Sequence, residues 1–248
     1  MKAIYILWLR ELKRYSRSKA QIATSLGQPL LYLLVLGYGL SPIFRRSGEG
    51  SYLQFMAPGV ITLTVLSLSM FSGASLLWDR QFGVLRETLV APVPRIYIMI
   101  GRTFGSASTA LLQGLLVGVV CVLAGFRPLS LQSLPLALVF LVLIAVVFTA
   151  IGTAIGSTLK DMQTFQMVTN LLVAPLFFLS GALFPLDDVP AALKFAAALD
   201  PLSYGVDGFR GALIGEAHFG MKLCFAVLSV LGIVMLSAGA WRFAKMEA

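Results

Sequence analysis

Few side chains in this sequence could carry chemistry, and they are not spaced as a catalytic centre. The only histidine is His218, which excludes the HExxH zinc motif and any triad that needs a second histidine. No GxxxxGK[ST] stretch occurs, so the chain lacks the phosphate loop that commonly holds ATP. Cys121 and Cys224 lie in apolar runs, where neither a disulfide framework nor a thiolate metal site is expected. We therefore predict no catalytic residue, no metal and no directly bound cofactor.

A stripe of polar and aromatic side chains inside apolar runs is the next candidate, and its members recur with helical spacing. The candidate pathway-lining residues are Thr64, Ser67, Phe71, Gln166, Asn170, Val173 and Phe177. Because polar groups in lipid are costly, a stripe of this kind should face protein or a pathway. Ser and Thr side chains also suit plain packing between helices, whereas Gln166 and Asn170 are harder to explain in that way.

Membrane-spanning helices must position these side chains, because the composition excludes a water-soluble protein. The chain has 248 residues, of which 58% are hydrophobic and 12% charged. Soluble domains have about half and about a quarter, respectively. The mean hydropathy of +0.89 also excludes a disordered chain, and it excludes a nucleic-acid-binding protein despite the net charge of +8.

Charge-free gaps between ionisable residues locate the spans, since a charge at the bilayer centre is costly. Each gap holds about 19 residues or more, close to the ~20 that a helix needs to cross a bilayer. The gaps run between residues 19 and 45, 49 and 79, 102 and 127, 127 and 160, 161 and 187, and 222 and 242. We predict an all-α polytopic membrane protein with six transmembrane helices.

Lys and Arg residues set the expected orientation, because cytoplasmic loops carry an excess of them. With the N-terminus in the cytoplasm, thirteen of the 19 Lys and Arg residues face the cytosol and six face outside. The acidic residues divide five to six, so the whole net charge of +8 is cytoplasmic. Both termini are then expected in the cytoplasm.

The first 19 residues predict an amphipathic helix on the inner membrane surface rather than a cleaved signal peptide. Their basic region is too long for a signal peptide, carries Glu11 and lacks a convincing cleavage site. On a helix, apolar and aromatic side chains share one side and cations the other: Tyr5, Trp8, Leu9, Leu12 and Tyr15 against Arg10, Lys13, Arg14 and Arg17. Such a helix either anchors the topology alone or also docks a partner.

A cytoplasmic segment, residues 79–102, is too long and too patterned for a simple turn. A helical stretch there ends at Pro92 and Pro94 and carries three apolar residues on one side, Phe82, Leu85 and Leu89. A partly apolar helix below the length of a span indicates a docking surface. A connector that lies on the membrane is the alternative.

The second unusual segment, residues 179–215, is expected outside the cytoplasm. Two apolar helical pieces of about a dozen residues, 190–200 and 201–214, are shorter than a span, and Asp200 is a credible N-cap for the second. We predict a re-entrant hairpin over residues 187–215 that dips into the outer leaflet and packs on protein. A helix pair lying on the surface is the alternative.

Four strings carry a resemblance to a known family. They are LSGALFP (179–185), DPLSYGVDGFRGALIG (200–215), ETLVAPVPR (87–95) and FMAPGV (55–60). With them the chain resembles ATP-binding-cassette (ABC) transporter permeases of the type-2 exporter class, which includes daunorubicin-type drug efflux and lipo-oligosaccharide nodulation-factor exporters. The likeness covers nearly the whole chain, as a single permease domain over residues 1–248.

The resemblance implies roles for the unusual segments. Residues 1–19 correspond to the connecting helix and residues 79–102 contain the coupling helix, both against a separate ATPase subunit. The implied coupling interface comprises Phe82, Leu85, Arg86, Glu87, Pro92, Pro94, Arg95, Arg10 and Arg14. The hairpin is the implied outer gate region, with Pro185, Pro201, Tyr204, Asp207 and Arg210. The pathway is implied between the second and fifth spans of two protomers.

The resemblance also implies the partners and the cellular location. Two copies of an ABC ATPase would use ATP and Mg, and the permease would pair with itself or with a paralogous permease. The assembly would lie in the lipid bilayer of a bacterial plasma (inner) membrane, with no nucleic acid as partner.

The expected function is ATP-driven export of an amphipathic drug-like or lipid-linked substrate from the cytoplasm or inner leaflet. No carboxylate or lysine lies near the middle of a span, which disfavours a proton-coupled or sodium-coupled carrier. Two alternatives stay open: a polysaccharide or glycolipid export permease, and a membrane scaffold or channel that works without ATP.

Overall fold

The chain forms a bundle of long helices in this computed structural model, which describes residues 2–39, 41, 51–84, 94–186 and 189–244. No strand occurs in those ranges, and the all-α prediction is confirmed. The helices are α1 (Lys2–Arg17), α2 (Lys19–Leu31) with its π-helical continuation η1 (Tyr32–Tyr38), α4 (Tyr52–Met70), α5 (Ser72–Gln81), α7 (Arg95–Leu123), the 3-10 turn η2 (Leu131–Ser133), α8 (Leu134–Thr158), α9 (Met162–Leu179), α10 (Ala191–Leu199), α11 (Pro201–Ile214) and α12 (Met221–Ala244).

Six helical stretches are long and apolar enough to cross a membrane, which confirms the number predicted from the charge-free gaps. They are Lys19–Tyr38, Tyr52–Gln81, Ile96–Leu123, Leu131–Thr158, Met162–Leu179 and Met221–Gly239. Two of these spans extend beyond their gap, because α5 continues past Asp79 and α7 begins before Arg102. The two charges at these helix ends, Asp79 and Arg102, pair with each other.

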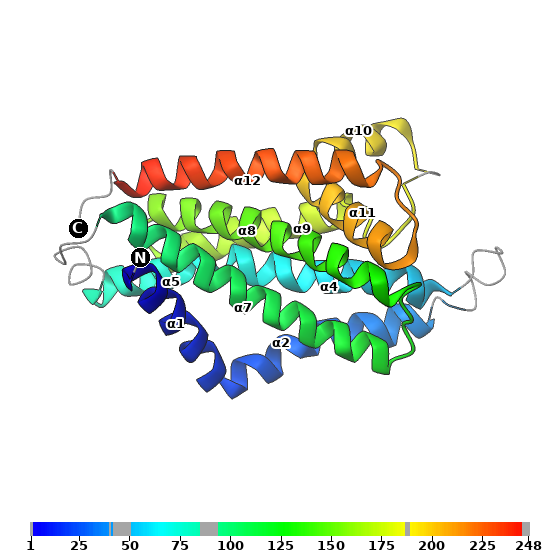
Figure 1. The fold of residues 1–248 in the computed structure, drawn as a ribbon, viewed down its shortest axis with the longest axis horizontal. Coiled ribbons are helices and arrows are strands. Elements are labelled where there is room, and N and C mark those ends of the chain that lie inside the picture. Colours follow the sequence, from blue (N-terminus) through cyan, green and yellow to red (C-terminus); the bar gives the residue numbers. More distant parts are fainter. Residues whose placement is uncertain (1, 40, 42–50, 85–93, 187–188, 245–248) are drawn as a thin grey trace.

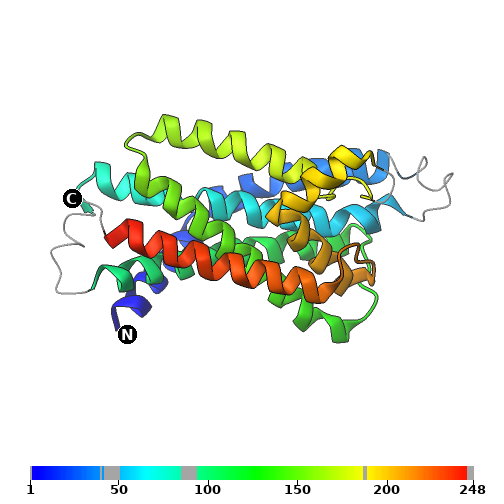
Figure 2. The same cartoon turned by 90° about the horizontal axis from the view of Figure 1, so that it is seen from above.

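The long helices run along one axis of the bundle, as Figures 1 and 2 show. The start of α1 and the last turns of α12 lie at one end, here called the terminal end. The short helices α10 and α11 lie at the opposite end, here called the hairpin end. α1 crosses the bundle obliquely and meets α2 at its lower edge in Figure 1.

α4 and α8 form the centre of the bundle. Nearly every residue of α4 is buried, because its side chains are apolar or small on all faces. The tightest crossing lies where α4 gives way to α5 and passes α8. There a Cβ atom on Gly156 would lie only 2.6 Å from the carbonyl oxygen of Gly73. Glycine at this crossing lets two backbones touch, which is how membrane helices gain contact without a hydrophobic driving force.

α1 packs against a strip of small residues on α7. A Cβ atom on Gly101 would lie 3.0 Å from the carbonyl oxygen of Ile4, and one on Gly105 would lie 2.8 Å from the side chain of Glu11. The two glycines, one helical turn apart, therefore form the shallow groove in which α1 lies.

Two side-chain hydrogen bonds continue this contact. The indole nitrogen of Trp8 donates to the Ser108 hydroxyl (3.0 Å), and the Tyr15 hydroxyl donates to the side-chain oxygen of Gln113. Tyr5, predicted on the apolar face, is 58% exposed. The face of α1 that meets the protein thus includes polar atoms, because α7 offers hydroxyl and amide partners there.

α10 and α11 occupy the two stretches predicted as short helices, and they differ in burial. α11 is buried along most of its length against α8, α12 and α4, whereas α10 is mostly exposed. The Asp200 carboxylate accepts a hydrogen bond from the Leu202 backbone N–H (2.8 Å), which confirms the predicted N-cap. α11 therefore packs on protein, whereas α10 lies on the surface of the bundle, and the re-entrant placement of residues 187–215 stays a prediction.

Candidate functional site

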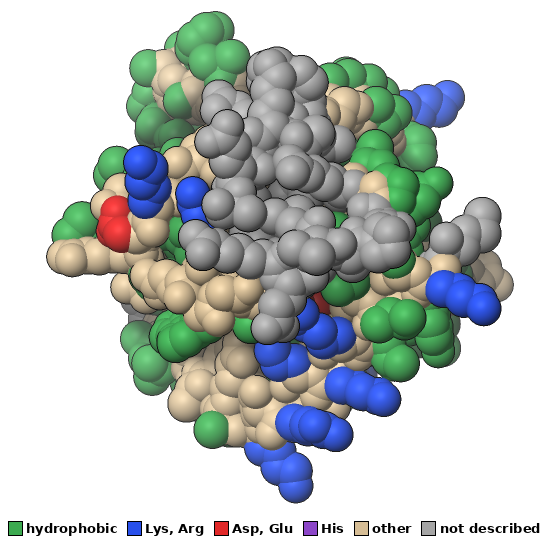
Figure 3. All heavy atoms as spheres, turned by 90° about the vertical axis from the view of Figure 1, so that its left-hand side faces the viewer, with side chains coloured by type: hydrophobic (Ala, Val, Ile, Leu, Met, Phe, Trp, Pro, Cys, Tyr) green, Lys and Arg blue, Asp and Glu red, His purple; other side chains and the backbone are tan. Residues whose placement is uncertain are grey.

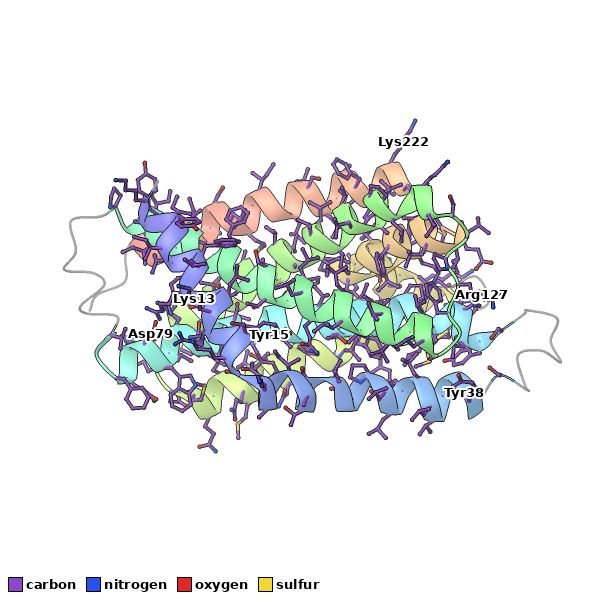
Figure 4. All side chains as sticks on the ribbon, turned by 60° about the horizontal axis from the view of Figure 1, so that its bottom comes forward. Lys13, Tyr15, Tyr38, Asp79, Arg127 and Lys222 are labelled. Carbon is purple, nitrogen blue, oxygen red and sulfur yellow. The ribbon has the colours of Figure 1, made fainter. Side chains whose placement is uncertain are left out.

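An ionic cluster at the terminal end joins three helices. Asp79 on α5 accepts hydrogen bonds from Arg10 on α1 and from Arg102 on α7, each with an Nη2–Oδ2 distance of 2.6 Å. Glu11 on α1 pairs with Arg14 at 2.5 Å. These five residues are called the ionic cluster below. Figure 4 shows Asp79 beside α1 at this end.

Burial is uneven within the ionic cluster. The side chain of Arg102 is 7% exposed and that of Asp79 is 12% exposed, whereas the side chain of Arg10 is 36% exposed. Arg102 also donates to the carbonyl oxygen of Ser75 (3.2 Å). A buried charge is tolerated only when it is paired, so Asp79 is the residue that allows Arg102 to lie inside the protein.

The ionic cluster lies near the end of α5 and the start of α7, the two helices that flank residues 85–93. α5 ends at Gln81, and Gly83 follows with a φ of +77°, a conformation that favours glycine. α7 begins directly after Pro94. Asp79 therefore lies in the last turn of α5, and Arg102 lies about two turns into α7.

The predicted coupling residues are only partly visible. Phe82 stacks on Trp78, with ring centroids 5.5 Å apart, and the two residues are 69% and 50% exposed. Pro94 is exposed, and Arg95 starts α7, although its side chain is not described. The remaining coupling candidates, Leu85, Arg86, Glu87 and Pro92, lie outside the described residues, so their roles stay predictions. The structure does bring Arg10 and Arg14 into one cluster.

The exposed side of α1 is basic. Lys13, Arg14 and Arg17 are exposed along it. Figure 3 views the molecule from the terminal end and shows Lys and Arg side chains gathered at the lower edge, where α1 lies in Figure 1. A basic helix at this edge suits anionic lipid headgroups or an acidic partner.

The second-span pathway candidates do not form one surface. Thr64 is 5% exposed, and its hydroxyl bonds to the carbonyl oxygen of Val60 within α4 (3.0 Å). Ser67 is half-buried. Phe71 is exposed, and its ring meets that of Phe165 on α9 edge-on, with centroids 6.4 Å apart. Of these three candidates, only Phe71 is exposed on the outside of the chain.

The fifth-span candidates divide in the same way. Phe177 is buried against Tyr32, with ring centroids 5.9 Å apart, and Val173 is half-buried. Gln166 and Asn170 are exposed on the outside of α9. Amide side chains are costly against lipid, so this exposed surface suits a protein partner or an aqueous pathway, and its role stays a prediction.

The signature residues of the hairpin make contacts within the hairpin end. Pro201 begins α11, and the Tyr204 hydroxyl donates to the carbonyl oxygen of Ala198 (2.8 Å). The buried carboxylate of Asp207 accepts hydrogen bonds from the backbone N–H groups of His218 (2.7 Å) and Phe219 (2.8 Å). These contacts tie α11 to α10 and to the start of α12. Burial also raises the pKa of the nearby Asp200 carboxyl from 3.8 to about 7.

Arg210 ties α11 to the end of α9 and to α4. Its Nη2 atom donates to the carbonyl oxygens of Gly181 (2.8 Å) and Ala182 (3.4 Å), and its guanidinium carbon lies 3.9 Å from the centroid of the Phe55 ring. A cavity of about 920 Å³ lies beside it, here called the hairpin cavity. Its lining includes Gln54, Phe55, Arg127, Pro185, Asp207, Arg210, Glu216 and His218.

Sequence reasoning did not identify Asp79, Arg102 and Glu11 as a site. Asp79 and Arg102 are 23 residues apart, and nothing local indicates that they touch. The available signal was that two opposite charges border the same loop, each directly beside an apolar run. Two helices that leave and re-enter the membrane at one loop are neighbours, so such charges are expected to meet.

The potential metal ligands among the described residues are scattered. Within them, no group of three or more His, Cys, Asp or Glu side chains could hold a metal ion. Cys121 and Cys224 are both free and buried, as expected for small residues inside the bundle.

Comparison with known proteins covers most of the chain. The sequence model of the ABC-2 type transporter family matches residues 2–214. The chain is 30% identical to Nodulation protein J of Rhizobium leguminosarum bv. trifolii, over 86% of this chain and 79% of that protein. It is 28% identical to the inner membrane transport permease YadH of Escherichia coli strain K12, over 92% and 89%. It is 29% identical to the putative transport permease ycf38 of Cyanophora paradoxa, over 85% and 73%.

Proposed function

The chain belongs to the ABC-2 type transporter family, and from that premise we propose that it is the membrane subunit of an ATP-driven exporter. It is a multi-pass membrane permease. In the proposed assembly, two copies of a separate ATPase bind ATP and Mg²⁺, since this sequence has no phosphate loop. The cargo is an amphipathic drug-like or lipid-linked molecule taken from the cytoplasm or the inner leaflet.

The ionic cluster is the observation that carries this proposal. An ATPase can drive the membrane helices only through contacts that differ between its two states. Asp79 ties α1 to both helices that flank the 85–93 segment. A force applied to α1 or to that segment therefore reaches α5 and α7 together.

The exposed aromatic pair Trp78–Phe82 supports a partner surface at the same place. The two rings stack on each other and leave more than half of Phe82 uncovered. Aromatic side chains are enriched at protein interfaces, where burying them supplies much of the binding free energy. The proposed ATPase covers this pair together with the basic side of α1.

The exposed amides of α9 support pairing with a second permease. Gln166 and Asn170 lie on the outside of a spanning helix, where Leu171 and Phe178 are also exposed. In the proposed dimer, made of two copies or of two paralogous permeases, this mixed surface faces the partner and the pathway. A pathway wall that is mostly apolar with a few amides suits an amphipathic cargo.

The basic side of α1 supports the proposed orientation. The terminal end lies in the cytoplasm of a bacterial cell and the hairpin end faces outward across the inner membrane. In this arrangement the cations of α1 meet the anionic inner leaflet and the ATPase.

Affinity purification of the tagged full chain from native membranes tests the proposal. The expected result is co-purification of an ATPase that carries a phosphate loop, with ATP hydrolysis in the purified complex. Phe82→Ala should weaken that association on the order of tenfold, as expected for the loss of an aromatic anchor. A chain that purifies alone, with no nucleotide-binding partner, would instead support a scaffold or channel.

The matched control is Phe195→Ala. Phe195 lies on α10 at the hairpin end and is 69% exposed, the same as Phe82. If both variants lose the partner equally, the loss reflects general damage and the proposed surface is wrong.

A further inference from the structure

Arg210 is a buried cation that has no ion-pair partner among the described residues and has one donor without an acceptor. It is 7% exposed, and the ion pairs formed among the described residues do not include it. Two carbonyl oxygens accept from Nη2, and Phe55 covers one face of the guanidinium. The Nε donor is buried and has no acceptor in the described part of the chain. A guanidinium has five N–H donors, so Arg210 can bind a further acceptor through Nε.

The hairpin cavity adjoins this unsatisfied group. Its volume of about 920 Å³ falls in the range of small-molecule sites. Arg127, on the connection between α7 and α8, lines the same cavity as Arg210. The Arg127 backbone is fixed by a hydrogen bond from its N–H to the Gln54 side chain (3.2 Å). Its side chain is exposed at the hairpin end, as Figure 4 shows. Two arginines from different segments therefore line one cavity.

The carboxylates of the cavity do not neutralise these cations at contact distance. Asp207 accepts from two backbone N–H groups and from the Cys224 thiol (3.5 Å), so its oxygens are already used. Glu216 is exposed. Both carboxylates act on Arg210 only from beyond ion-pair distance. A buried cation costs free energy unless it is paired, and Arg210 forms no ion pair among the described residues, so an anion is the ligand expected in this cavity.

We propose that the hairpin cavity binds a phosphate-class anion between the guanidinium groups of Arg210 and Arg127. The planar guanidinium donates two parallel hydrogen bonds to phosphate oxygens, which lysine cannot do. The binding does not depend on the proposed export activity, since neither the ATPase nor the pathway surface of α9 contributes to the cavity.

A neighbouring face of α11 indicates what kind of molecule carries the phosphate. Phe209 and Leu213 each precede a cavity-lining residue by one position, and they line a second cavity of about 710 Å³ whose other walls are apolar. A cavity lined by two arginines and an apolar cavity thus border the same helix. This arrangement suits the headgroup and the acyl chains of an anionic lipid, although free phosphate shares the headgroup chemistry.

Lipid binding to the full chain in detergent micelles tests the proposal. Native mass spectrometry would compare phosphatidylglycerol with a diacylglycerol of the same acyl chains, which lacks the phosphate. We expect phosphatidylglycerol to bind at least about tenfold more tightly, and Arg127→Gln to remove about tenfold of that affinity. Arg210→Lys should lose a similar factor while keeping the charge. Arg210 also donates hydrogen bonds to two carbonyl oxygens. If Arg210→Lys does not fold for that reason, the lipid affinity of Arg127→Gln alone tests the proposal.

Lys222→Gln is the matched control. Lys222 is exposed at the start of α12, does not line the cavity, and points away from the bundle in Figure 4. It should bind phosphatidylglycerol as the unchanged protein does. Inorganic phosphate, added as a competitor, distinguishes free phosphate from a lipid headgroup as the ligand. Displacement of the lipid indicates a site for the free anion, and no displacement indicates a site for the lipid headgroup. Equal binding of both lipids without any phosphate binding, unchanged affinity in Arg127→Gln, or an equal loss in Lys222→Gln would overturn the proposal.

Discussion

Replacing Asp79 with asparagine keeps the shape of the side chain and removes the one charge that two arginines share. Arg102 is then left as an unpaired charge with 7% of its side chain exposed. Removing one partner of a buried ion pair costs about 3–5 kcal/mol. Arg10→Gln removes the other pair, but the Arg10 side chain is 36% exposed and solvated, so that change costs at most about 1 kcal/mol.

Thermal unfolding of the full chain in detergent measures this difference. In a protein of this size 1 kcal/mol corresponds to about 2–4 °C. Asp79→Asn should therefore lower the Tm on the order of 10 °C, and Arg10→Gln by no more than about 4 °C. Adding Arg102→Gln to Asp79→Asn should restore stability, because two neutral side chains carry no unpaired charge. A Tm unchanged by Asp79→Asn, or a double variant less stable than Asp79→Asn, would refute the buried pair.

Three further predictions concern packing, pH and orientation. Gly156→Ala should cost about 1–3 kcal/mol, because its new methyl group would lie 2.6 Å from the Gly73 carbonyl oxygen. Gly118→Ala, whose methyl group would meet its nearest side chain at 3.7 Å, should leave the same unfolding temperature almost unchanged. Burial raises the pKa of Asp200 from 3.8 to about 7, so the folded state holds this proton more tightly. Its contribution to stability is then full below about pH 4 and is lost as the pH rises through 7. Asp200→Asn keeps the cap, so a pH titration of unfolding should show that loss reduced, and an unchanged pH profile would contradict the assignment. Green fluorescent protein fused to the C-terminus should fluoresce and alkaline phosphatase fused there should be inactive; the reverse result would invert the proposed topology.

The six spans could be predicted from the sequence because of the cost of placing charges in a membrane. Charges are so costly in hydrocarbon that the empty gaps alone predicted six helices. The gaps did not predict that α5 and α7 continue past Asp79 and Arg102, which pair with each other. A rule about single charges does not report which charges pair.

Local chemistry also predicted parts of the hairpin. Asp200 followed by Pro201 marks a helix start on its own, and the structure shows the cap. The close approach of Gly73 and Gly156 could not be predicted in this way, because it depends on which faces of α5 and α8 meet. The unsatisfied donor of Arg210 likewise appears only when α9, α11 and α4 are placed together.

Transport per ATP hydrolysed tests the central claim most directly. The permease and its ATPase would be reconstituted in vesicles, with efflux of an amphipathic fluorescent dye and ATP hydrolysis measured on the same sample. The account predicts that Phe82→Ala keeps assembled complexes hydrolysing ATP but lowers transport per ATP on the order of tenfold, while Phe195→Ala changes neither. Equal transport per ATP in the two variants would contradict coupling through the Trp78–Phe82 surface.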